Sequence, residues 1–324
     1  MSSNTTDLLL DIDYLVKYLN LTFTSPGLVT NLIHFYFLIE SIKKHPIFIC
    51  LKVTCVADFL MLSDVFVIKT VTIITYVDNK NCIGYVNLAD VLFKVFSQWI
   101  STTSTMTATT VTVLIAFLHV FDLKFSRGWT RKTAVTVSIV TVVFSVLFNI
   151  IETSAFLIAF VQLNFAVCNQ QGILQNYLMN NTNWISTFAK IAVQSETVLN
   201  AFLFFLIIFM IIYLIRLRKE KKSKNGMTRT ITYLMYSFLL ADVLGLVCFG
   251  ALLEKDANGN GTQTSLILPL ELFELFKVLA ANIRPFIILS ACKDYQETVK
   301  SFFSLTGGVT VVPKISDLSS RTQT

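Results

Sequence analysis

LILPLELFELFKVLAANIRPFIILSA, residues 266–291, is the stretch that decides the fold of this chain. At about 1.5 Å of rise per residue, it is long enough to cross the roughly 30 Å hydrocarbon core of a bilayer as one helix. Arg284 and Pro285 lie inside this run. Because proline cannot donate a backbone hydrogen bond, we expect the helix to bend near Pro285. Hydrocarbon tolerates such a bend only where neighbouring helices or internal water satisfy the freed carbonyl group, which predicts a polar centre inside a helical bundle.

The residues that follow this span predict a short helix lying on the membrane surface. The segment CKDYQETVKSFF, residues 292–303, is amphipathic. Its apolar side carries Tyr295, Val299, Phe302 and Phe303, and its lysines lie elsewhere. A helix of this kind typically rests in the plane of the membrane interface.

The overall composition is that of a protein that crosses the membrane several times. Hydrophobic residues make up 54% of the 324 residues and charged residues only 14%, which lies outside the usual range of soluble proteins. Apolar segments of spanning length occur at 19–42, 47–73, 88–121, 133–158, 190–217, 228–253 and 266–290. The sequence therefore predicts an all-α membrane protein, a seven-transmembrane helix bundle with a short amphipathic helix after the last span.

The basic residues indicate how the spans are oriented. The segment RLRKEKKSKNGMTR, residues 216–229, is the most basic stretch of the protein and joins the fifth and sixth spans. Because cytoplasmic segments carry the excess of lysine and arginine, we expect a multi-pass protein of the plasma membrane with its N-terminus outside the cell. The expected division is an extracellular N-terminus at 1–18, a transmembrane domain at 19–290, the surface helix at 291–304 and a disordered cytoplasmic tail at 305–324.

Glycosylation triplets and two cysteines fall in the segments assigned to the outside. Asn4, Asn180 and Asn260 each begin an Asn-x-Ser/Thr triplet, and we expect them to carry glycans. Cys82 and Cys168 lie in the first and second outer loops, where oxidation is allowed. They are either disulfide partners or two separate thiols.

Several motifs resemble those of rhodopsin-like G-protein-coupled receptors. Asn31, the pair Ala57-Asp58 and Pro285 match residues of the first, second and seventh helices of that class. FSVLFNIIETSAF (144–156) resembles FMRFamide-type neuropeptide receptors, and VLIAFLHVFDLKFS (113–126) and NIRPFIILSACKDYQETVKSFF (282–303) resemble the nematode serpentine chemoreceptors of class W. The resemblance implies a ligand-activated receptor, of chemosensory or neuropeptide type, that signals to a heterotrimeric G protein by helix rearrangement.

The chain departs from this pattern where the class contacts its G protein and switches. His119 occupies the place of the arginine in the third-helix Asp-Arg-Tyr motif, and Leu118 replaces the acid. Arg284 replaces the asparagine before the seventh-helix proline, and Ile288 replaces the tyrosine that follows it. The resemblance therefore implies the fold more strongly than it implies the coupling.

The charged residues inside the spans need partners, because an unpaired charge in hydrocarbon is costly. In the fold that the resemblance implies, the second and seventh helices touch at the level of Asp58 and Arg284, and we expect a buried ion pair there. Asp242 on the sixth span is a candidate second acceptor. The alternative is that Arg284 extends to the inner surface. Asn31, Asp58, Asp242, Arg284 and Pro285 together form the predicted core polar switch.

Polar residues in the outer halves of the spans form the candidate ligand pocket, because polar groups converging near one mouth of a bundle are typical of a ligand site. The predicted pocket residues are Lys69, Gln98, Ser101, Thr102, Thr105, Glu196, Glu271, Glu274 and Lys277. Each of them could alternatively make a packing contact or extend to the membrane interface. At the inner end of the third span, His119 and Asp122 are three residues apart, can face one another and form the predicted G-protein side.

Two function classes compete on this evidence. The first is a receptor whose partners are an unknown small-molecule or peptide ligand, a heterotrimeric G protein and membrane lipid, with no nucleic acid. The alternative is a polytopic transporter or channel with a polar intramembrane path, although no internal repeat supports it. The three histidines lie on or beside different spans, and no catalytic motif is present, so the sequence predicts no enzyme, no metal site and no cofactor.

Overall fold

All regular structure in the described part of the chain is α-helical. A computed structural model describes residues 3–41, 45–78, 88–125, 130–161, 184–220, 226–257 and 264–306. The helices within these ranges are α1 Ser3–Ser41, α2 Ile47–Asp78, α3 Leu88–Phe125, α4 Arg131–Val161, α6 Trp184–Glu220, α7 Gly226–Ala257, α8 Thr264–Ala291 and α9 Lys293–Thr306. Six of the seven predicted spans fall inside one helix each, and the first, 19–42, coincides with α1 up to its last described residue, Ser41, which confirms the seven-helix reading of the apolar segments.

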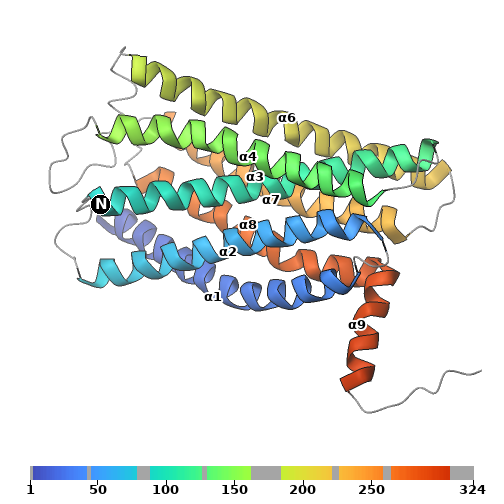
Figure 1. Ribbon diagram of the computed structural model, residues 1–324. Coiled ribbons are helices and arrows are strands. Elements are labelled where there is room, and N and C mark those ends of the chain that lie inside the picture. The colour runs from blue at the N-terminus through green and yellow to red at the C-terminus, as the bar shows by residue number, and fades with distance from the viewer. Residues whose placement is uncertain are drawn as a thin grey trace, which may run out of the picture.

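The long helices lie side by side in a bundle, and α9 leaves its end almost at a right angle (Figure 1). The α3 helix contacts α2, α4, α6 and α7, so it occupies the middle of the bundle. The α8 helix packs between α1 and α7 and also touches α2. The start of α1 lies at the opposite end of the bundle from α9. Following the orientation predicted from the sequence, we call the end at α9 the inner end and the opposite end the outer end.

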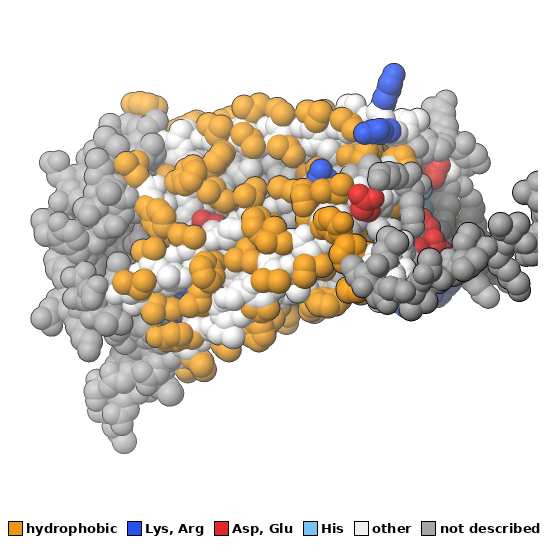
Figure 2. Space-filling view, turned by 60° about the horizontal axis from the view of Figure 1, so that its bottom comes forward, with side chains coloured by type: hydrophobic (Ala, Val, Ile, Leu, Met, Phe, Trp, Pro, Cys, Tyr) orange, Lys and Arg blue, Asp and Glu red, His pale blue; other side chains and the backbone are white. Residues whose placement is uncertain are grey.

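The lateral surface of the bundle is suited to lipid. Hydrophobic side chains cover the side shown in Figure 2, and most of its charged side chains gather towards one end. Large apolar residues such as Phe205, Val198 and Ile212 are more exposed than buried. By length and composition alone, the described helices include three able to cross a membrane, Val95–Asp122, Arg131–Ile151 and Gln194–Lys219, and a bent pair, Glu271–Ala291 with Lys293–Ser304, counts as a fourth.

The helices α2 and α8 carry charged side chains that point into the bundle, and these charges lower the mean hydropathy of the two helices. Asp58 and Lys69 on α2 and Arg284 on α8 are all buried. Mean hydropathy counts these charges as if they faced lipid. In the structure they contact other charged side chains inside the bundle. A count of spans by composition alone therefore misses helices that belong to the bundle.

A close contact joins α8 to the middle of α1. Pro26 lies inside α1 and cannot donate a backbone hydrogen bond. Near Pro26, the Asn282 side chain of α8 donates from Nδ2 to the carbonyl oxygen of Phe23 at 2.8 Å. A Cβ atom on Gly27 would lie 1.9 Å from Asn282 Oδ1, so the approach requires glycine at this position.

The α9 helix turns 92° from the axis of α8 and docks on the inner end of α1. His34 Nδ1 and Tyr295 Oη are 2.6 Å apart, and Ser41 Oγ donates to Thr298 Oγ1 at 3.2 Å. The Phe302 ring meets Tyr36 and Phe37 edge-on. A surface helix was predicted at 291–304, and α9 covers Lys293–Thr306.

Tyr295 was predicted on the apolar side of the surface helix, and that side of α9 is the one that packs on α1. The side chain is buried against α1, and this burial raises the pKa of its phenol. Cys292 beside it is also buried. The α1 helix begins at Ser3, well before the expected start of the first span, and the predicted tail beyond residue 306 lies outside the described residues.

Candidate functional site

The guanidinium of Arg284 joins three helices in the centre of the bundle. Arg284 is 6% exposed, and its Nη1 forms an ion pair with Oδ1 of Asp58 on α2. Its Nε donates to Oγ of Ser237 on α7 at 3.3 Å, and its Cζ lies 3.6 Å from the ring centroid of Phe238. The face of an aromatic ring attracts a cation most strongly when water is excluded. Arg284 is thus paired, hydrogen-bonded and stacked, and it does not extend to the inner surface.

Asp242 lies outside this direct contact, contrary to the prediction that it would be a second acceptor for Arg284. Among the described residues, the second hydrogen bond of Arg284 goes to Ser237. Asp242 is five residues further along α7, about 7.5 Å along the helix axis. It is half-buried, and both Lys277 and Arg284 of α8 act on it electrostatically, Lys277 more strongly. Asp242 therefore belongs to the level of Lys277.

Asn31 and Pro285 are the other two residues of the predicted switch. Asn31 is buried on α1 and donates from Nδ2 to the Gly27 carbonyl at 2.9 Å, and the Cys55 thiol donates to the Asn31 carbonyl at 3.4 Å. The first bond lies within α1 and the second ties α1 to α2, and within the described residues neither reaches Arg284. Pro285 is buried next to Arg284, and α8 stays helical past it to Ala291.

A second charged group, which we name the outer cluster, links α1, α2, α3 and α8. It consists of Asn20, Asp64, Lys69, Ser97, Glu271 and Glu274. Lys69 is 4% exposed, and its Nζ lies 2.6 Å from Glu271 Oε2 and 2.5 Å from Glu274 Oε2. The sequence pointed to these three residues separately, and the structure brings them together as a bridge from α2 to α8.

The remaining members of the outer cluster were missed by the sequence prediction. Asn20 Nδ2 donates to the Glu271 carbonyl at 3.2 Å and reaches its Oε2 at 3.5 Å. Ser97 Oγ donates to Asp64 Oδ1 at 2.5 Å. Asp64 lies five residues before Lys69 in an apolar stretch, and that position was the available signal. No sequence signal pointed to Asn20, which begins a glycosylation triplet, or to Ser97.

Lys277 forms a third charged level, between the outer cluster and Arg284. Its Nζ lies 4.2 Å from the centroid of the Phe273 ring. Asp242 of α7, Glu196 of α6 and Glu274 of α8 all act on it electrostatically. The structure therefore gathers three of the predicted pocket residues here from two helices, with Asp242 from a third.

The hydroxyl-rich run of α3 contributes less to the predicted pocket. Gln98 is exposed, and Thr102 spends its hydroxyl on the Gln98 carbonyl of its own helix at 2.9 Å. Ser101 is half-buried. Thr105 Oγ1 is buried and has no hydrogen-bond partner within the described residues. The place of Gln98 and Thr102 in the ligand pocket stays a prediction.

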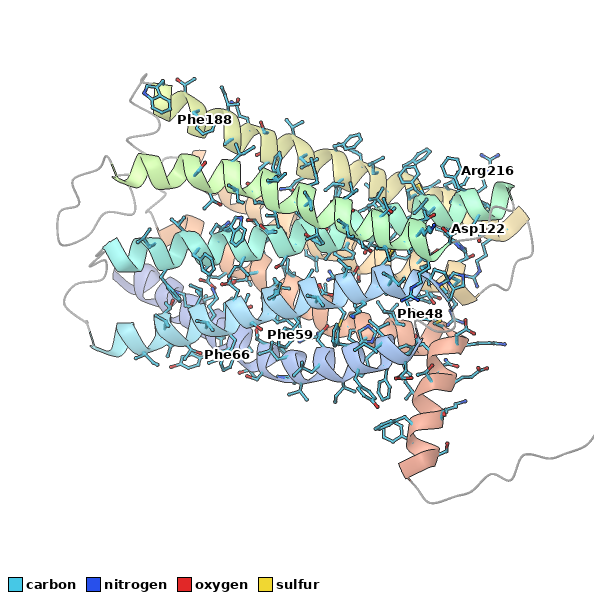
Figure 3. The ribbon with its side chains drawn as sticks, viewed as in Figure 1. Phe48, Phe59, Phe66, Asp122, Phe188 and Arg216 are labelled. Atoms are coloured by element: carbon cyan, nitrogen blue, oxygen red, sulfur yellow. The ribbon has the colours of Figure 1, made fainter. Side chains whose placement is uncertain are left out.

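The inner ends of α3 and α7 are joined by a hydrogen bond that the sequence did not predict. His119 is buried, and its Nε2 lies 2.9 Å from Thr228 Oγ1 on α7. Asp122 acts on His119 only electrostatically, so the predicted contact between the two is replaced by the bond to Thr228. Figure 3 shows Asp122 and Arg216 at the same end of the bundle from which α9 departs.

One family matches nearly the whole chain. The family described as serpentine-type 7TM GPCR chemoreceptor Srw matches residues 18–306. This chain belongs to the Srw family. No individual curated protein matches it significantly.

Membership of the Srw family confirms the predicted class W chemoreceptor resemblance and the seven-transmembrane bundle. It makes the chain a multi-pass membrane protein of a receptor class, which is not a class of enzymes. The resemblance to FMRFamide-type receptors stays a prediction. Of the predicted modification sites in this Srw chain, Cys82, Cys168, Asn180 and Asn260 lie outside the described residues, and the Asn4 side chain is not described.

Proposed function

We propose that this Srw chain is a cell-surface receptor that binds its ligand between the outer halves of the helices and signals to a G protein at their inner ends. The observation that carries the proposal is the line of charge along α8. Glu271, Glu274, Lys277 and Arg284 follow one another at spacings of three, three and seven residues, which keeps them near one side of a helix. Their contacts link the outer cluster to the centre of the bundle.

Movement of α8 transmits ligand binding from the outer end of the bundle to its inner end. A ligand that binds the outer cluster more tightly in one helix arrangement than in another shifts the population towards that arrangement. Any shift of α8 displaces Arg284, whose partners Ser237 and Phe238 are on α7. The inner end of α7 is held to α3 by the bond between His119 and Thr228. Release of that bond opens the inner end of the bundle to a G protein.

The orientation belongs to the same proposal. With the N-terminus outside at the plasma membrane, the outer cluster opens to the exterior and α9 lies at the cytoplasmic side. The same orientation places Cys82 and Cys168 where a disulfide can form and Asn4, Asn180 and Asn260 where glycans can be added. Support for it comes from the basic segment 216–229 between α6 and α7.

The experiment is expression of the full chain with an epitope tag at residue 1 in a heterologous cell. The tag is expected to be accessible on intact cells. Second-messenger and calcium signals are then recorded against panels of volatile compounds and peptides, which separates the chemosensory reading from the neuropeptide reading. Co-expression of different G-protein α subunits identifies the coupling.

The variant tested beside the unsubstituted chain in this screen is Thr228→Val. It removes the bond to His119 and is expected to raise the signal measured without ligand. A tag that is accessible only after permeabilisation overturns the orientation. A ligand-independent ion current or solute flux, with no second-messenger response to any panel member, favours the transporter or channel alternative.

A further inference from the structure

Carboxylates outnumber amines in the outer half of the bundle. Among the side chains described there, five carboxylates and three amines interact across α1, α2, α6, α7 and α8. The carboxylates are those of Asp64, Glu196, Asp242, Glu271 and Glu274, and the amines are those of Lys17, Lys69 and Lys277. Carboxylates held between helices are strongly unfavourable without a counter-charge. Five carboxyl groups thus face three amines among the described residues, and Arg284, which also acts on Asp242, is already paired with Asp58.

Of the two glutamates that contact Lys69, Glu274 is the more accessible. Lys69 shares one ammonium group between two glutamates, and only one oxygen of each is in contact with it. The side chain of Glu274 is 27% exposed, against 12% for Glu271. A ligand that enters between the helices therefore meets the carboxylate of Glu274, whose counter-ion Lys69 is shared with Glu271.

A buried amide oxygen beside this pair also lacks a donor. Asn20 is 0% exposed, and its Nδ2 is committed to Glu271. Its Oδ1 is buried and has no hydrogen-bond partner among the described residues. A buried acceptor left without a donor is unfavourable, and this one is independent of the surplus of acids. An ammonium group carries three donors and no acceptor, so it suits both features at once.

We propose that the outer cluster is a subsite for a protonated amine, with Glu274 as the charge partner and Asn20 Oδ1 as an acceptor. The inference rests on the proposed function, since it names the chemistry of the ligand at the same mouth. An ammonium group can belong to a small amine or to the N-terminus of a peptide. An anionic ligand meets the surplus carboxylates and is repelled. The acidic mouth also raises the local concentration of cations and speeds their entry.

The test measures the thermal midpoint of the purified full-length protein against increasing probe concentration at constant ionic strength. The small-amine probe is 2-phenylethylammonium, and its neutral counterpart is 2-phenylethanol. The peptide arm compares phenylalanine amide with N-acetylphenylalanine amide. A saturable rise in midpoint is expected for at least one ammonium probe and for neither neutral counterpart. A response to 2-phenylethylammonium alone identifies a small amine, and a response to phenylalanine amide alone identifies a peptide N-terminus.

Two variants assign the effect to the cluster. Glu274→Gln is expected to raise the half-saturating concentration of the active probe at least tenfold, and Glu297→Gln on the exposed side of α9 is the matched control, expected to leave it unchanged. Lys69→Met frees both glutamates from their shared amine and is expected to lower the half-saturating concentration. Equal responses to charged and neutral probes, no saturable response at all, or an unchanged half-saturating concentration in both cluster variants overturns the proposal.

The binding assay needs no G protein, so its outcome is separable from that of the proposed receptor function. Saturable ammonium binding without any cellular signal upholds the subsite and counts against the receptor. A neutral or anionic ligand that activates second-messenger signalling while no ammonium probe binds upholds the receptor and overturns the subsite.

Discussion

Removing either member of the Asp58–Arg284 pair is expected to destabilise the protein far more than removing both. The pair is buried on both sides and joins α2 to α8. Taking away one partner leaves a charge alone in the bundle, which typically costs about 3–5 kcal/mol. Replacing both by apolar side chains of similar volume is often close to neutral. The relevant variants are Asp58→Leu, Arg284→Met and the double variant.

The two single variants are not expected to be equal. In Arg284→Met, the isolated Asp58 carboxylate can take up a proton and so become neutral. In Asp58→Leu, the guanidinium of Arg284 cannot lose its proton and keeps only Ser237 and Phe238 as partners. The cation–π contact with Phe238 is present in the parent as well as in this variant, so it does not offset the loss. We therefore expect Asp58→Leu to be the less stable of the two single variants, and both single variants to be much less stable than the double variant.

The assay is surface expression on intact cells together with the thermal midpoint of the purified protein. A destabilisation of about 3 kcal/mol raises the unfolded fraction more than a hundredfold, since each 1.4 kcal/mol is a factor of ten. Glu40→Ala on the exposed face of α1 is the control for loss of a charge. The reasoning is refuted if Arg284→Met keeps normal surface expression while Asp58→Leu loses it, or if the double variant is as unstable as the two losses added together.

Three further contacts give predictions of their own. Gly27→Ala forces Asn282 away from α1 and is expected to cost about 1–3 kcal/mol of stability, and adding Asn282→Ala should restore part of it; a thermal midpoint that the second change leaves unmoved contradicts the contact. His119→Ala removes the bond to Thr228, worth about 0.5–1.5 kcal/mol, and should raise basal second-messenger signalling up to about tenfold; a fall in basal signalling opposes the proposed transmission. Tyr295→Phe removes the hydrogen bond between His34 of α1 and Tyr295 of α9 and should lower the thermal midpoint by an amount equivalent to about 1 kcal/mol. An unchanged midpoint shows that this hydrogen bond does not hold α9 on α1.

The sequence predicted the helices and the central pair for a common physical reason. Apolar runs long enough to cross a bilayer have few alternatives to helix, because hydrocarbon leaves backbone groups no other partner. Asp58 and Arg284 lie deep within two such runs, and the resemblance places those two helices in contact. Few partners were available to them, so their pairing could be expected without coordinates.

Which neighbour a polar side chain meets could not be predicted in the same way. In a soluble helix, the apolar stripe fixes which face turns inward, but in a bilayer the lipid-facing side is apolar too. The rotation of each helix about its axis is then poorly determined by the sequence. This is why Gln98 was expected inside and is exposed, and why Arg284 contacts Ser237 in place of Asp242.

The residues in which this chain departs from the rhodopsin-like pattern are also residues that join helices in the structure. Arg284 connects α8 to α2 and α7, and His119 connects α3 to α7. Both therefore act on α7, one at the centre of the bundle and one at its inner end. An arginine at the centre brings its own positive charge to Asp58, so the charge balance there does not depend on a bound cation. A neutral histidine bond at the inner end is weaker than an ion pair. These two substitutions together favour a receptor whose centre is firmly held and whose cytoplasmic end is easily released.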